Sequence, residues 1–143
     1  MGTTPRLLCG LMLFSALLLL AVDLHAGQTG KFDKLSEADR KAFGERFQKE
    51  IWPLLERCGK DGCVGCHLTK KGSLKMAGEP AKDFALLLGE GYLLRKDPGS
   101  MLERILDKDK KRRMPPDDKP GWSEGEVQVL RQFVDDLDKK NKL

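Results

Sequence analysis

Cys63-Val64-Gly65-Cys66-His67 is the most informative stretch of this 143-residue chain. It has the pattern C-x-x-C-H, which is the attachment sequence for c-type haem. Thiols three residues apart lie on one side of a helical turn, so each can bond to one vinyl group of the same porphyrin. The histidine after the second cysteine then lies where it can bind the iron axially. We therefore predict one covalent haem c, attached through Cys63 and Cys66, with His67 as an iron ligand.

Other uses of these cysteines remain open. Together with Cys58 they match the first three ligands of a plant-type [2Fe–2S] ferredoxin, but no fourth cysteine follows Cys66. A zinc site of three cysteines and His67 would place adjacent residues at neighbouring tetrahedral corners, which is strained. A thioredoxin-like pair needs a strand before it and a βαβ unit, and neither pattern is visible. The last alternative is a chance match in a loop.

The N-terminal segment has the layout of a secretory signal peptide. Arg6 precedes the nearly unbroken apolar run 7–22, and the small residue Ala26 follows. We predict that residues 1–26 are a signal peptide and that the protein is periplasmic or secreted. An uncleaved anchor, which would hold the protein at a membrane, is the alternative, although a spanning helix needs about 20 apolar residues. Lipidation of Cys9 is not expected, because this cysteine opens the apolar run.

Cleavage would leave three of the four cysteines, and an odd number cannot form a simple disulfide framework. The remaining domain, over residues 32–140, is long enough for one folding unit. Its apolar side chains are modest in number, so a buried cofactor would strengthen a thin core.

Helix signals dominate this domain and no strand pattern is visible. Ser36 and Ser100 are expected N-caps, and Ser123-x-x-Glu126 has the pattern of a capping box. Pro53 should end or restart the first helix, a short helix is expected over 81–88, and 59–78 should form a loop. The stripes expected to face the core are Phe43, Phe47 and Ile51; Met101, Leu102, Ile105 and Leu106; and Val127, Leu130, Val134 and Leu137. These patterns predict an all-α domain.

A methionine is the expected sixth iron ligand if the iron only carries electrons. Met101 belongs to an apolar stripe and is expected in the core, whereas Met76 follows His67 too closely to pass around the edge of the ring. Met114 lies farther along the chain, at the head of a Met-Pro-Pro segment that should be extended and rigid. We therefore predict Met114 as the sixth ligand, with an exposed loop residue or an open iron position as the alternatives.

These segments together resemble class I cytochromes c, and most of all the small single-haem modules called planctomycete-type cytochrome c domains. The matching segments cover roughly residues 40–137 and are Trp52-Pro53-Leu54-Leu55-Glu56-Arg57-Cys58, the C-x-x-C-H motif, Asp97-Pro98-Gly99-Ser100-Met101-Leu102, Met114-Pro115-Pro116 and the Trp-Ser-x-x-Glu helix start. The resemblance implies a cytochrome c-like fold of three to five helices around one haem, whose first and last helices cross. Gly44 is a candidate for that crossing, and Pro80 for a backbone carbonyl that orients the histidine. Leu68, where such modules often have glycine, and the extra thiol of Cys58 are departures.

We expect an electron-transfer protein and not an enzyme, because Met114-Pro115-Pro116 provides a sixth ligand and no distal acid/base pair is evident. A haem-based enzyme or gas sensor with an open or labile sixth iron position is the alternative, but the only other histidine, His25, lies in the signal peptide. The basic run 108–113 adjoins Met114 and is expected either to steer an acidic redox partner or to be a solvated helix end. This run is single, short and without aromatic residues, so nucleic-acid binding is not expected.

Overall fold

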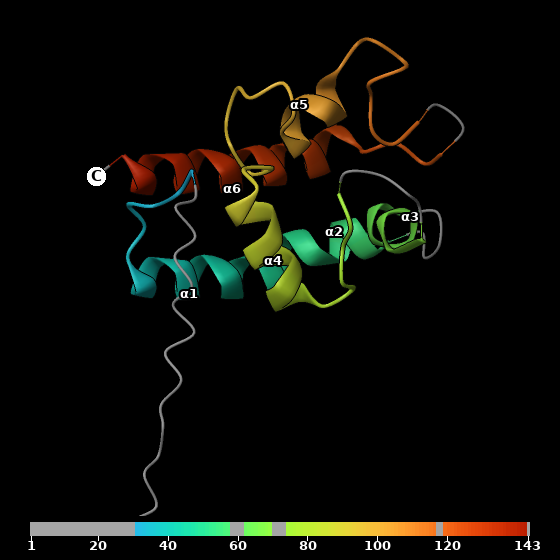
Figure 1. Ribbon diagram of the computed structural model, residues 1–143. Helices are drawn as coiled ribbons and strands as arrows, with labels where there is room; N and C mark the ends of the chain where they lie inside the picture. Colours follow the sequence, from blue (N-terminus) through green and yellow to red (C-terminus); the bar gives the residue numbers. More distant parts are fainter. Residues whose placement is uncertain (1–30, 58–61, 70–73, 117–118, 143) are drawn as a thin grey trace, which may run out of the picture.

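The computed structural model describes residues 31–57, 62–69, 74–116 and 119–142, and all regular structure within these ranges is helical. The elements are α1 (Glu37–Arg46), the π-helical segment η1 (Phe47–Ile51), α2 (Trp52–Glu56), α3 (Cys63–Thr69), α4 (Pro80–Gly89), α5 (Met101–Leu106) and α6 (Glu124–Asn141) (Figure 1). The all-α prediction is therefore confirmed. The predictions on residues 1–26 and on Cys58 lie outside the described residues. In the part of the chain that is described, no helix combines the length and apolar character needed to cross a membrane.

A single helical rod, formed by α1, η1 and α2 in succession, builds one side of the molecule. Its start is the predicted one, because the Ser36 hydroxyl accepts a hydrogen bond from the Asp39 amide at 3.1 Å. Pro53 restarts the helix and does not end it: it stands in the first turn of α2, where a missing N–H is tolerated. The π-helical turn of η1 lies directly before this restart.

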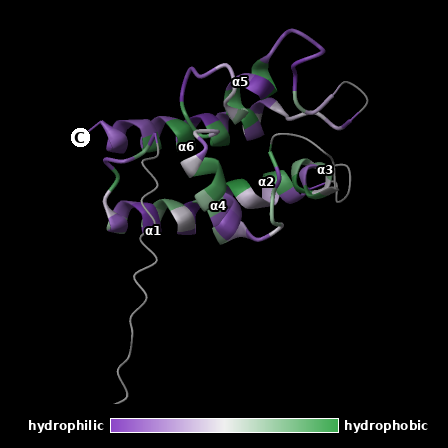
Figure 2. Cartoon of the chain, viewed as in Figure 1, coloured by the Kyte–Doolittle hydropathy of each residue, from purple (hydrophilic) through white to green (hydrophobic). Residues whose placement is uncertain are grey.

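The core lies between this rod and α6, which runs back alongside it (Figure 1). Phe43, Phe47 and Ile51 are buried on the rod as predicted. Phe133 of α6, which the predicted stripe left out, is also fully buried, and its ring centroid lies 5.7 Å from that of Phe43 and 6.1 Å from that of Phe47. Figure 2 shows hydrophobic residues toward the middle of the molecule and hydrophilic ones at the outer ends of α1 and α6.

Phe47→Ala is expected to lower the free energy of unfolding by about 3–5 kcal/mol, because it removes a fully buried ring. The ring of Phe47 lies among those of Trp52, Phe84 and Phe133, so three neighbours would border the cavity left behind. Urea unfolding measures the change. Val129→Ala, on the exposed face of α6, is the control and should shift stability by no more than about 0.5 kcal/mol. Equal losses in the two variants would contradict this packing.

Three expectations from the sequence are wrong in detail. Residues 63–69, inside the expected loop, form the helix α3. Leu106, expected on the buried stripe of α5, is 41% exposed, because α5 ends at this residue. A Cβ atom at Gly44 would lie 3.4 Å from the ring of Phe84, so this glycine marks the approach of α1 to α4 and not to the last helix.

Candidate functional site

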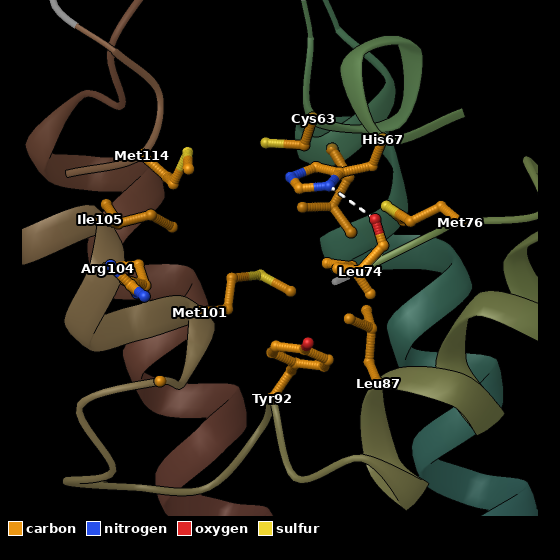
Figure 3. Close-up of a pocket in the computed structure, with 12 residues that line it drawn as sticks. Cys63, His67, Leu74, Met76, Leu87, Tyr92, Met101, Arg104, Ile105 and Met114 are labelled. Atoms are coloured by element: carbon orange, nitrogen blue, oxygen red, sulfur yellow. Dashed lines mark hydrogen bonds between the residues drawn. The ribbon is translucent and has the colours of Figure 1, made fainter. Parts of the chain in front are cut away.

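An open, mostly apolar cavity separates α3 from α5. It has a volume of about 140 Å³ and opens to solvent. Figure 3 shows His67 on one side of this space, and Met101 and Met114 on the opposite side. The residues that line it are Leu55, Cys63, His67, Leu74, Met76, Leu87, Tyr92, Gly99, Met101, Arg104, Ile105 and Met114.

The two cysteines of the motif lie one turn apart on α3, and neither forms a disulfide. Cys63, at the start of the helix, lines the cavity. Cys66 is half-buried and does not belong to the cavity lining. Burial raises the pKa of the Cys63 thiol above its ordinary value, although a hydrogen bond with Trp122 and the charge of Arg57 oppose that rise. The thiol therefore lacks the lowered pKa of a nucleophilic or thioredoxin-like cysteine.

The imidazole of His67 is oriented by a backbone carbonyl, and its Nδ1 lies 3.1 Å from the oxygen of Leu74 (Figure 3). Because a carbonyl oxygen only accepts hydrogen bonds, Nδ1 must carry the proton. This leaves the lone pair of Nε2 available to a metal, and a metal-binding histidine is usually oriented by such a second bond. The orienting carbonyl is thus that of Leu74 and not that of Pro80, which instead begins α4.

A buried carboxylate fixes the segment that carries this carbonyl. Asp83 is fully buried and accepts backbone hydrogen bonds from Ala77 at 2.6 Å, Gly78 at 2.9 Å and Glu79 at 3.2 Å. The same segment is tied to α3, because the Met76 amide donates to the carbonyl of His67 at 3.3 Å. Gly78 has a φ of +78°, a conformation that favours glycine. Asp83 therefore holds in place the loop that orients the histidine.

The three candidate methionines occupy different walls of the cavity. Met76 is buried and lies on the same side as His67, whereas Met101 and Met114 face His67 from across the space (Figure 3). Met101 packs against the core as predicted but also lines the cavity. Met114 is 41% exposed, and its amide donates to the carbonyl of Arg104 at 2.9 Å. The chain bends at Met114 and Pro115, so the expected extended segment is wrong. The bond between these two residues is cis.

The fold also brings to the cavity residues that the sequence did not single out. Tyr92 and Arg104 are polar side chains in a largely apolar wall. Leu74 contributes its carbonyl. Asp83 does not line the cavity, but it accepts the hydrogen bond that holds the backbone of Ala77. None of them belongs to a recognisable motif, because their roles arise only when α4 and α5 close on α3.

Within the described ranges, no three His, Cys, Asp or Glu side chains are grouped so that they could hold a metal ion. The iron–sulfur and zinc alternatives both require Cys58, which lies outside those ranges, so they remain open. No known protein family, curated protein or solved structure matches the chain.

Proposed function

We propose that the protein is an exported single-haem c-type cytochrome that carries single electrons between redox partners, and that its helices form a cytochrome c-like fold. One observation carries this proposal. Cys63 and His67 of the C-x-x-C-H motif line one side of an apolar cavity, with the Nε2 of His67 left available and a thioether on the opposite side. This donor set would suit a covalent haem: Cys63 and Cys66 would bond it, and an imidazole and a thioether would bind its iron.

In this proposal Cys63 and Cys66 hold the haem through thioether bonds, and His67 and Met114 are the iron ligands. The bound haem would supply an iron that cycles between its ferrous and ferric states. The carbonyl of Leu74 keeps the His67 ring oriented and increases the basicity of Nε2. The apolar wall, which includes Leu87 among its residues, limits the access of water. His/Met ligation favours a higher reduction potential than ligation by two histidines.

A haem-based enzyme or ligand sensor is the second candidate, and the exposure of Met114 favours it. A ligand that is 41% exposed can leave the iron more readily than a buried one, which would open the sixth position to a small molecule. Arg104, in the same wall, would place a positive charge beside such a molecule. We rank the electron carrier first because Met114 faces His67 across the cavity.

We infer that the redox partner has an acidic surface. The side chains of Lys108, Lys110 and Lys111 are exposed on the turn that leads to Met114, which itself lies at the cavity wall. Arg112 is partly neutralised, because it pairs with Asp107 at 3.2 Å and with Asp109 at 3.4 Å. A basic surface beside the cofactor would attract an acidic partner and speed their encounter.

The first test of the proposal is production of the full chain together with a c-type haem maturation system. The purified protein is expected to retain one haem through denaturing electrophoresis and mass spectrometry. Its ferric spectrum should contain the weak long-wavelength band of a methionine–iron bond. Electron exchange with an acidic redox protein should slow as salt is added. At 0.1 M salt, the attraction between exposed charges more than about 10 Å apart is largely screened. A protein that binds no haem, or binds it only non-covalently, would contradict the proposal.

A further inference from the structure

We propose that Arg57 is a positioning residue for the sixth iron ligand, because it holds the loop residues Gly121 and Trp122, just before α6, beside Pro115 and against the cysteine helix α3. This inference rests on the proposed function, since it assumes that Met114 binds the iron. Arg57 itself does not line the main cavity. It would therefore act through the loop and not on the iron.

One guanidinium makes three contacts to the start of α6 and the loop before it. Arg57 forms an ion pair with the carboxylate of Glu126. Its Nη2 donates to the carbonyl of Gly121 at 2.7 Å, and its Cζ lies 5.6 Å from the centroid of the Trp122 ring. A planar guanidinium can pair with a carboxylate and stack on an aromatic face at the same time, which lysine cannot reproduce.

The backbone of Arg57 is held next to the cysteine helix α3. Arg57 ends α2, and its amide donates to the carbonyl of Pro53 at 3.1 Å. A Cβ atom at Gly62 would lie only 2.0 Å from the carbonyl oxygen of Arg57, so the two backbones are in direct contact. Gly62 directly precedes α3, and Arg57 therefore links the cysteine helix to the loop on the other side.

The loop meets the cysteine itself at this point. A small cavity of about 10 Å³ lies here, and it is lined by Leu54, Arg57, Gly62, Cys63, Pro115, Pro120 and Trp122. Trp122 also hydrogen-bonds with the Cys63 thiol. The contacts of Arg57 thus lie where the loop approaches the site of haem attachment.

Met114 is held by its own backbone and through its neighbour Pro115. Its amide donates to the carbonyl of Arg104 on α5. Pro115 borders the small cavity together with Trp122, and Arg57 holds Trp122 in place through contacts to Gly121, Trp122 and Glu126. Because the Met114 side chain is 41% exposed, burial alone does not fix it. Loss of the Arg57 contacts should therefore let Met114 leave the iron more often.

Arg46 provides a matched control on the same helical rod. It also pairs with a carboxylate of α6, Asp136, at 2.8 Å, and its Cζ lies 5.4 Å from the centroid of an aromatic ring, that of Phe133. The exposed fractions of the two arginine side chains are nearly equal, 28% for Arg46 and 30% for Arg57. Arg46, however, lines neither the main cavity nor the small one beside Cys63. A role limited to helix packing predicts the same behaviour for both residues.

The experiment compares Arg57→Gln, Arg57→Lys and Arg46→Gln in the full-length, haem-loaded protein. Cyanide binding to the ferric protein should become about tenfold faster in Arg57→Gln, as expected when hydrogen bonds to a charged group are lost. Arg57→Lys should show an intermediate rate, and Arg46→Gln the wild-type rate. Hydrogen exchange of the Met114 and Ser123 amides, at the two ends of the loop, should accelerate in Arg57→Gln only. This second measurement does not depend on which residue binds the iron.

The possible outcomes separate the two proposals. If Arg57→Gln and Arg46→Gln change cyanide binding and amide exchange equally, Arg57 is a packing residue and this inference is overturned. If amide exchange responds only to Arg57→Gln but the wild type lacks the methionine–iron band, the loop contact is supported and the ligand assignment is wrong. Both expected responses, together with the band in the wild type, support the inference.

Discussion

The double variant Cys63→Ser, Cys66→Ser is expected to contain no covalently bound haem. A serine hydroxyl cannot replace the thiol that forms a thioether with a porphyrin vinyl group, so both attachment bonds are lost. The variant should also be less stable, because a ligand that binds only the folded state stabilises that state. Mass spectrometry and haem staining after denaturing electrophoresis measure attachment, and thermal unfolding measures stability. Retained haem after denaturation would contradict the assignment of these two cysteines.

Cys58→Ser is the control, and it separates the remaining alternatives. A haem attached through Cys63 and Cys66 does not need the third thiol, so this variant should carry the same haem content as the wild type. An iron–sulfur cluster or a zinc site would use Cys58 as a ligand, and its loss would remove the metal. Loss of metal in Cys58→Ser, measured by elemental analysis, would therefore favour those alternatives over haem.

The parts of the fold that depend on local chemistry could be predicted from the sequence. Ser36, Ser100 and Ser123 each accept the expected capping hydrogen bond, because a cap needs only residues within one turn. Helix α3 could not be predicted in the same way. It has only seven residues and includes Gly65, so its stability depends on packing, which shows in the burial of Val64.

In the candidate site, too, only the residues defined by local sequence could be predicted. His67 and the two cysteines could be found because they are adjacent in the sequence. The carbonyl that orients His67 could not, because a choice between Leu74 and Pro80 requires the path of the loop between α3 and α4. The partnership of Arg57 with Glu126 spans 69 positions in the sequence, so only the folded chain reveals it. Motifs thus identify the residues that would touch the haem, whereas the residues that hold them come from tertiary structure.

Met114→Ala is expected to open the sixth iron position in the haem-loaded protein. The weak long-wavelength band of the ferric form should disappear, and the reduction potential should fall because the thioether is lost. If Met114 occupies the iron in about 99 of 100 wild-type molecules, its removal should raise the apparent affinity for cyanide about 100-fold. The fold should change little, since Met114 is 41% exposed and contributes little to the core. Optical titration with cyanide and a redox titration measure these changes.

Met101→Ala and Met76→Ala are the matched controls, since all three methionines line the cavity. Met76 lies on the same side as His67, so Met76→Ala should keep the band and lose only stability, because its side chain is buried. Met101 faces His67 as Met114 does, which makes it the real competitor for the iron. If the band disappears in Met101→Ala and persists in Met114→Ala, Met101 is the ligand and the protein remains an electron carrier. If the wild type lacks the band and binds cyanide readily, the iron position is open and the protein is better described as a haem enzyme or sensor.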